Sequence, residues 1–362
     1  MRERSIDVGR GLLVLLMVYC HVLQFFADTQ LFALASRLID AVNLLAFPSF
    51  VFFFGRTVAL AYLKKPYLKA LPGMLRTFAR TLCAFYLSGI GYRVLRENKA
   101  FSAGTVRRVL TLSDIPGWSE FLISFALFML LTAVLFGGLR ALARRPLLAL
   151  AAGAACVACC LIPYERVTST QAALLIGGTQ FSFFPVVQYA PYFLAGIVFT
   201  GASRAVRMAL LALSAAASAA GAAYAAMLGG LPSRFPPHWA WILLPALGTA
   251  ALCALSYGLC ALRAPALSRA LEVLRGALSG VGGRSLYYLV SSNLVLFAMA
   301  GRGIVPQLSR KSVLPFTLPI QSPLGALCWT AVLLLALSFV ASLAGRGAKR
   351  GQGGTHGPSD AK

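Results

Sequence analysis

The chain has 362 residues, of which 59% are hydrophobic and only 12% are charged, and its mean hydropathy is +0.78. A soluble domain usually carries about 25% charged residues, so the composition excludes an ordinary soluble protein. The formal net charge of +23 does not indicate a nucleic-acid partner, because most cations flank apolar runs, where they set membrane topology and contact the anionic headgroups of a lipid bilayer.

Apolar runs recur along the chain, and most have about 18 residues or more, which is enough to cross a ~30 Å hydrocarbon core. They predict an all-α fold, a polytopic transmembrane helical bundle of about ten spans. In chain order the expected spans are 8–27, 43–62, 74–95, 118–140, 147–163, 182–200, 207–229, 239–262, 284–300 and 322–344. Residues 31–42 and 102–112 are expected to be short amphipathic or interfacial segments. Residues 1–345 then form one multi-pass domain, and the Gly-rich, polar residues 346–362 are expected to be a disordered tail.

The distribution of Lys and Arg predicts the orientation of these spans. More of them lie between spans on the N-terminal side of the bundle than on the opposite side, although the opposite side includes the basic loop 96–117. The positive-inside rule then places both termini in the cytoplasm of a protein of the cell (inner) membrane. The first span is expected to be retained and not cleaved as a signal peptide, since Asp7 and Arg10 interrupt its flank and His21 lies inside its apolar stretch.

The first expected span carries ionisable groups, which are costly inside a bilayer and mark either a function or a paired structural role. Arg10 and His21 are eleven residues apart, which is three helical turns plus about 20°, so they share a face and lie roughly 16 Å apart along the axis. The stripe with 3-4 spacing that contains them comprises Asp7, Arg10, Val14, Met17, His21, Gln24 and Asp28. If Arg10 lies near the cytoplasmic interface, His21 lies at or beyond the bilayer centre.

His21 at that depth is suited to accept a proton beside a water-filled cavity, because the ordinary pKa of histidine is ~6.5. The alternative is that His21 is a buried residue that bonds across helices, and that Arg10 is an ordinary positive-inside anchor. The two other histidines are His238, in a Pro-rich loop, and His356, in the tail. A three-histidine metal site is therefore not expected, and we predict no metal.

Further polar residues lie within the expected spans, namely Arg56, Arg80, Glu120 and Asn293. Arg76 and Arg80 are four residues apart and face the same way on a helix. Together with Arg56 and three nearby lysines, they are candidates for a cytoplasmic pocket that binds a phosphorylated ligand. Contact with lipid headgroups is the alternative.

One stretch resembles a known family. Residues 4–22, RSIDVGRGLLVLLMVYCHV, are similar to the first helix of the acyltransferase-3 membrane family, whose mark is Arg or Lys, ten residues, then His; Arg10 and His21 match it. Three weaker blocks follow in the family's order, similar to its P-x-F-F-x-x-S-G, F-F-x-x-G and G-x-x-S-L-x-x-Y segments. These blocks are residues 47–62, 183–199 and 282–297. Phe54 stands where many members have Ser, and Ser291 where many have His.

The resemblance implies a membrane O-acyltransferase that moves an acyl group, usually acetyl, from cytoplasmic acyl-CoA to a hydroxyl of a cell-surface glycan or lipid-linked sugar. His21 would be the general base on the acceptor hydroxyl or a transient acyl carrier. Arg10 would orient the surroundings of His21 or bind the phosphates or thioester carbonyl of the donor. Arg56, Arg76 and Arg80 would bind the acyl-CoA.

Two other functions remain open from the residues. The first is a proton-coupled transporter or flippase for a small solute or a lipid-linked sugar, in which His21 relays a proton. An inverted internal repeat would favour it, but none is evident in the sequence. The second is a non-catalytic component of a membrane assembly. The oligomeric state, the acceptor and the acyl chain are not determined by the sequence.

Overall fold

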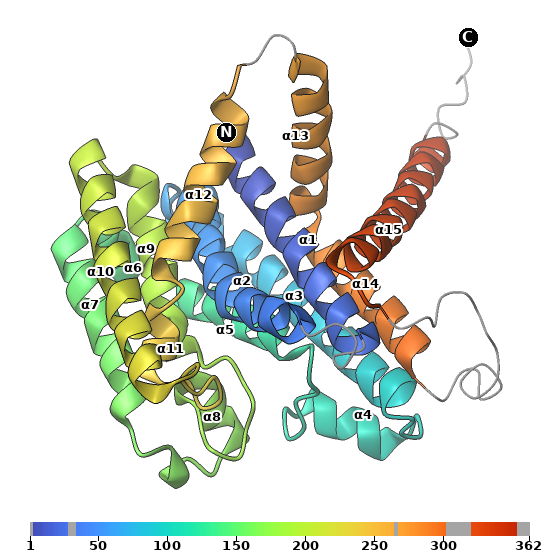
Figure 1. Cartoon of the computed structure of the whole chain (residues 1–362), viewed down its shortest axis with the longest axis horizontal. Helices are drawn as coiled ribbons and strands as arrows, with labels where there is room; N and C mark the ends of the chain where they lie inside the picture. Colours follow the sequence, from blue (N-terminus) through green and yellow to red (C-terminus); the bar gives the residue numbers. More distant parts are fainter. Residues whose placement is uncertain (1–2, 28–33, 264–266, 302–319, 353–362) are drawn as a thin grey trace, which may run out of the picture.

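The computed structural model describes residues 3–27, 34–263, 267–301 and 320–352, and within these ranges the chain is built from helices and contains no β-strand (Figure 1). The all-α prediction is therefore confirmed for the described part of the chain. The helices of the first half are α1 Arg4–Phe26, α2 Leu34–Val58, α3 Tyr67–Gly91, α4 Ala103–Leu110, α5 Glu120–Val134, α6 Phe136–Leu142, α7 Pro146–Ala158 and α8 Thr170–Ile176. Those of the second half are α9 Val186–Gly201, α10 Arg204–Leu228, α11 Trp239–Leu243, α12 Ala246–Ala261, α13 Ser268–Gly283, α14 Ser285–Ala300 and α15 Pro323–Gln352.

Five helical stretches are long and apolar enough to cross a membrane, or six if α5 and α6 are counted as one broken span. The five are Arg4–Phe26, Leu34–Leu63, Arg204–Leu228, Trp239–Ala261 and Pro323–Leu343. They correspond to five of the expected spans. Three more expected spans are apolar helices of fewer than 18 residues, α7, α9 and α14, and a fourth is α3, which is long but carries charged residues. The expected number of about ten spans is thus not confirmed, and the orientation of the termini stays a prediction.

The helix expected over 118–140 is broken in the structure. It ends at Val134, and α6 leaves it at an angle of 90°. Elsewhere, the segment expected to be interfacial at 31–42 is continuous with α2 from Leu34 onward, whereas the short helix expected at 102–112 is present as α4, which is capped by Ser102. Helix α15 continues to Gln352, seven residues into the segment expected to be a tail; residues 353–362 lie outside the described ranges.

Helix α1 is the central element, since it packs against α2, α12, α13, α14 and α15. Its tightest neighbour is α13, which lies in a segment that we expected to be a loop. Glycines allow this approach: a Cβ on Gly282 of α13 would lie 1.8 Å from the Asp7 carbonyl oxygen, and one on Gly11 of α1 would lie 2.1 Å from the Leu278 carbonyl oxygen. Small residues at such contacts let two helix backbones come close together, as is common between helices in membranes.

A second close pair forms between α2 and α9. A Cβ on Gly55 would lie 2.2 Å from the Phe193 carbonyl oxygen, and one on Gly196 would lie 2.1 Å from the Phe52 carbonyl oxygen. Each helix thus supplies a glycine where the other brings its backbone closest. This contact holds the end of α2, and with it Arg56, firmly against α9.

Candidate active site

His21 lies on α1 with only 6% of its surface exposed, and Asn293 of α14 fixes its ring. His21 Nδ1 is 2.8 Å from Asn293 Oδ1. The amide nitrogen of Asn293 donates to the backbone carbonyl of Trp118 at 2.9 Å, and since a carbonyl only accepts, the Asn293 oxygen must face the ring. The proton of the neutral imidazole is therefore on Nδ1, which leaves the Nε2 lone pair as the basic site.

Trp118 connects this pair to a second side chain of α1. Its indole nitrogen donates to Gln24 Oε1 at 2.8 Å, and Gln24 lies one turn beyond His21 on the same stripe. The Trp118 backbone has a φ of 57°, a left-handed conformation that is uncommon for a bulky residue. Its ring packs at 5.4 Å from Tyr92. The contacts of the Trp118 side chain with Gln24 and Tyr92 thus fix the position of the Trp118 carbonyl, which accepts from the Asn293 amide.

Arg10 also contacts α14. Arg10 Nη2 donates to Ser285 Oγ at 2.5 Å. Ser285 and Asn293 are eight residues apart, so the contacts of Arg10 and His21 lie about 12 Å apart along α14 at ~1.5 Å per residue. The face of α1 that contains Arg10 and His21 is therefore turned toward one helix. The sequence presented Asn293 as an embedded polar residue, but not as the partner of His21.

Two charged side chains, Glu120 and Arg234, have buried polar atoms without a hydrogen-bond partner among the described residues. Glu120, the first residue of α5, is buried, and its Oε2 has no hydrogen-bond partner among the described residues. Arg234, from the loop between α10 and α11, also has a buried Nε without one. Its guanidinium lies over the rings of Phe184 at 5.0 Å and Phe235 at 4.6 Å. The positive charge of Arg234 acts on both His21 and Glu120.

Arg234 was not singled out from the sequence. In the sequence, Arg234 is one of many cations and lies in a Pro-rich loop. No local pattern indicates that this loop turns the Arg234 side chain inward. Glu120, in contrast, was identified from the sequence as a charged residue at the start of an apolar run. Buried polar atoms that lack a partner are rare in native proteins and call for an explanation.

Arg56 is fully buried, and its guanidinium is held by the opposite end of α1. Its Nη2 donates to Glu3 Oε1 at 2.7 Å and to the Tyr257 hydroxyl at 2.6 Å, and that hydroxyl donates to the same Glu3 oxygen at 2.6 Å. Burial on its own would raise the pKa of Glu3, but the hydrogen bonds from Tyr257 and Ser5 and the charge of Arg56 outweigh it, so the pKa of Glu3 is lowered. The rings of Phe199 and Tyr257 lie 5.1 and 5.0 Å from the Arg56 guanidinium carbon.

The other predicted donor-binding arginines lie elsewhere. Arg76 and Arg80 are exposed on α3, one turn apart. Arg56, in contrast, is enclosed between the start of α1 and the helices α2, α9 and α12. The structure therefore does not bring the three guanidinium groups to one surface.

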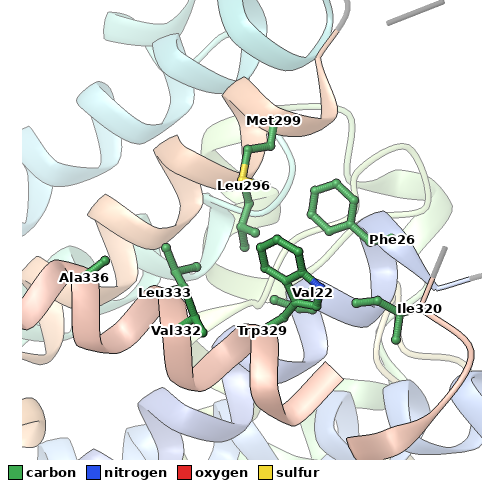
Figure 2. A pocket seen from close by; sticks show the side chains of 9 residues that line it. All are labelled: Val22, Phe26, Leu296, Met299, Ile320, Trp329, Val332, Leu333 and Ala336. Atoms are coloured by element: carbon green, nitrogen blue, oxygen red, sulfur yellow. The ribbon is translucent and has the colours of Figure 1, made fainter. Parts of the chain in front are cut away.

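An apolar cavity of about 140 Å³ lies between the ends of α1 and α14 and the start of α15. Figure 2 shows Trp329 of α15 turned toward Val22 of α1 and Leu296 of α14. Val22 follows His21 in the sequence, and Leu296 lies one turn beyond Asn293 on the same face of α14. His21 and Asn293 do not line the cavity, but each lies within one turn of a lining residue of its own helix, and the lining is almost entirely hydrocarbon.

Comparison with known proteins gives one finding. The model of the acyltransferase-3 family, described as an acyltransferase domain, matches residues 3–344. The match includes both helices that carry the His21–Asn293 pair and the loop that carries Arg234. No curated protein and no solved structure matches the chain.

Proposed function

The chain belongs to the acyltransferase-3 family of membrane proteins, and from this premise we propose that it transfers an acyl group from cytoplasmic acyl-CoA to a hydroxyl of a glycan or lipid-linked sugar on the far side of the membrane. The observation that carries the proposal is the fixed tautomer of His21. Asn293 keeps the proton on Nδ1, so a basic Nε2 lone pair is available at a buried position, as a general base requires.

In the direct route, Nε2 removes the proton from the acceptor hydroxyl while the oxygen attacks the thioester carbonyl carbon. The carbon–sulfur bond then breaks, and the imidazolium returns its proton to the departing thiolate. In the alternative route, Nε2 itself attacks the carbonyl and the carbon–sulfur bond breaks to release the thiolate. The acceptor oxygen then displaces the imidazole, and the proton of the acceptor hydroxyl passes to the thiolate. Both routes use the same lone pair and yield the ester and free CoA. Asn293 stabilises the ring orientation in either one.

Arg10 acts at some distance from this chemistry. At roughly 16 Å along the axis of α1, it does not reach the carbonyl on which His21 acts. We assign it to the anionic part of acyl-CoA, nearer the cytoplasmic surface, with Ser285 fixing the guanidinium when no donor is bound. Arg76 and Arg80 are exposed on α3 and are suited to contact the same phosphates, whereas Arg56 is already paired with Glu3.

Glu120 and Arg234 provide polar groups for the acceptor. The unpartnered Glu120 Oε2 accepts a hydrogen bond from a sugar hydroxyl, and the Arg234 guanidinium donates to an oxygen of the same sugar. Binding of the acceptor then satisfies two atoms that otherwise carry a desolvation cost of about 1–3 kcal/mol each. The partly exposed ring of Phe235 beside Arg234 supplies an apolar surface for a sugar.

The cavity beside Val22 and Leu296 limits the size of the acyl group. Its volume of about 140 Å³ is close to that of an engineered apolar cavity of about 150 Å³ that stays dry and holds benzene. A short acyl chain fits such a space and a fatty chain does not. An acetyl group, or one a few carbons longer, is therefore the proposed cargo.

The proposal is tested with the full chain in proteoliposomes that contain labelled acetyl-CoA, combined with mass spectrometry of surface polysaccharides from cells with and without the intact gene. We expect a mass gain of one acyl group that depends on the gene. His21→Ala should abolish transfer, and the matched variant His238→Ala should retain it, because the His238 ring stacks on Tyr224 and accepts from the Ala240 backbone. Full activity of His21→Ala would show that the catalytic assignment is wrong, and solute uptake into vesicles without acyl-CoA would favour a transporter.

A further inference from the structure

A groove of about 640 Å³ lies between α2, α7, α9, α10 and α12. Figure 1 shows α7 and α10 together at the outer edge of the helix bundle, away from α1. The wall is formed mainly by Ala, Leu, Val and Pro side chains, and the outer helix α10 buries almost none of its surface. The groove is therefore open to the hydrocarbon that surrounds the bundle.

The groove has the length of one membrane leaflet. Along α10 its wall runs from Arg207 to Ala217, ten residues, which is roughly 15 Å at ~1.5 Å per residue. That is half of a ~30 Å hydrocarbon core. A hydrocarbon chain that enters from the membrane surface thus reaches the far end of the groove near the bilayer centre.

The charge of the groove lies at one end, where the wall along α10 begins. Among its described lining residues Arg207 is the only charged one, and no carboxylate of the described chain pairs with it. The Arg207 guanidinium carbon lies 5.0 Å from the centre of the Phe199 ring, and Arg56 lies over the same ring at 5.1 Å. Tyr257, which also lines the groove, donates to Glu3. The groove therefore has a guanidinium at one end, with no carboxylate partner in the described ranges, and a long, mainly apolar wall.

We propose that this groove binds one anionic phospholipid of the bilayer, with its hydrocarbon tail between α7 and α10 and its phosphate on Arg207. The positive charge of Arg207 favours this occupant, because a phosphate oxygen accepts hydrogen bonds from a guanidinium. In a zwitterionic phospholipid, the cation of the headgroup weakens that attraction. The proposal does not depend on acyl transfer. It also implies that the bound lipid stabilises the Glu3–Arg56–Tyr257 cluster, since Phe199 and Tyr257 belong to both.

The test is native mass spectrometry of the delipidated full chain in detergent, to which phosphatidylglycerol or phosphatidylcholine is added. We expect one phosphatidylglycerol to be retained, and Arg207→Gln to reduce its retention about fivefold, the factor expected for one basic residue near an anionic surface. The matched control is Arg204→Gln, one turn away on α10, exposed and outside the groove lining; it should leave retention unchanged.

The apolar slot is tested separately by filling it. Ala154 of α7 lines the groove, and its neighbour Ala155 is exposed but does not. Ala154→Phe should abolish retention of either lipid, and Ala155→Phe should not. If Ala154→Phe loses its helical circular dichroism, Ala217→Leu on α10 tests the same point from the opposite wall. Equal retention of the two phospholipids, equal effects of the two arginine variants, or unchanged retention in the filled groove would each overturn the proposal.

Discussion

Replacing Glu3 by Ala removes the only carboxylate that contacts Arg56 among the described residues and leaves a cation buried. Breaking a buried pair by removing one partner costs about 3–5 kcal/mol. Arg56 is 0% exposed, but Glu3 retains 32% of its side-chain surface, so water that enters in place of the carboxylate screens part of the charge. The Tyr257 hydroxyl also stays within 2.6 Å of Arg56. We therefore expect Glu3→Ala to lower the free energy of unfolding by about 2–3 kcal/mol.

A second substitution separates loss of the pair from loss of packing. Arg56→Met keeps most of the side-chain volume and removes the charge, and replacing both members of a buried pair by apolar groups is often nearly neutral. The double variant Glu3→Ala/Arg56→Met should therefore be more stable than Glu3→Ala alone and lie within about 1 kcal/mol of the wild type. The measurement is equilibrium unfolding in mixed micelles of mild detergent and dodecyl sulfate.

The reasoning is refuted if Glu3→Ala unfolds within about 0.5 kcal/mol of the wild type, or if the double variant is no more stable than the single one. A further check uses pH. The pKa of Glu3 is lowered below 4.5 in the folded protein, so its contribution to stability is present above the unfolded pKa and is lost as the pH falls through the folded pKa. The stability difference between wild type and Glu3→Gln should stay constant from about pH 7 to 5 and shrink below about pH 4.5. A difference that grows in acid would contradict the pairing.

Two further predictions concern helix packing and the site. Gly282→Ala should destabilise the protein by about 1–3 kcal/mol, the usual cost of overpacking. The control Gly280→Ala should not, because a Cβ at Gly280 meets no atom within 4 Å. Thermal unfolding in detergent checks both variants, and equal melting temperatures would contradict the close approach of α1 and α13. Asn293→Ala should lower kcat for acyl transfer about 10- to 100-fold, the usual effect of removing a group that orients a functional histidine, without a matching rise in KM. Ser292→Ala, buried one residue away, is its control, and an unchanged kcat in Asn293→Ala would show that His21 is not oriented by this amide.

The sequence predicted the features that depend on local periodicity. The polar stripe of α1 is set by spacing within one helix, and the structure places Arg10 and His21 on the face that meets α14. The short amphipathic segment at 102–112 was predicted because its pattern is local, and the structure adds that Ser102 caps the resulting helix α4. These features need no information about the rest of the chain.

The features that were not predicted depend on contacts between distant residues. Asn293 is 272 positions away from His21, and no local pattern specifies that pairing. Arg234 is turned inward by a loop whose own sequence resembles that of an exposed turn. Helix α13 looked like a charged loop because Arg275 and its charged neighbours lie on one side; the side that packs on α1 carries Leu278 and Gly282. The break after Val134 is marked only by Gly137 and Gly138 just beyond it, and the run was predicted as one helix because it stays apolar from Phe121 to Leu139.

Helix α14 connects the position proposed for the donor with the position proposed for the acceptor. It is a single helix tied to α1 at two points, Arg10–Ser285 near one surface and His21–Asn293 deeper in the bundle. If α14 shifts along α1, both contacts are displaced together. On the roles proposed above, a donor that draws Arg10 away from Ser285 would therefore also change the orientation of the His21 ring. Such coupling is reciprocal, so an acceptor bound beside His21 would change the affinity for the donor by the same factor.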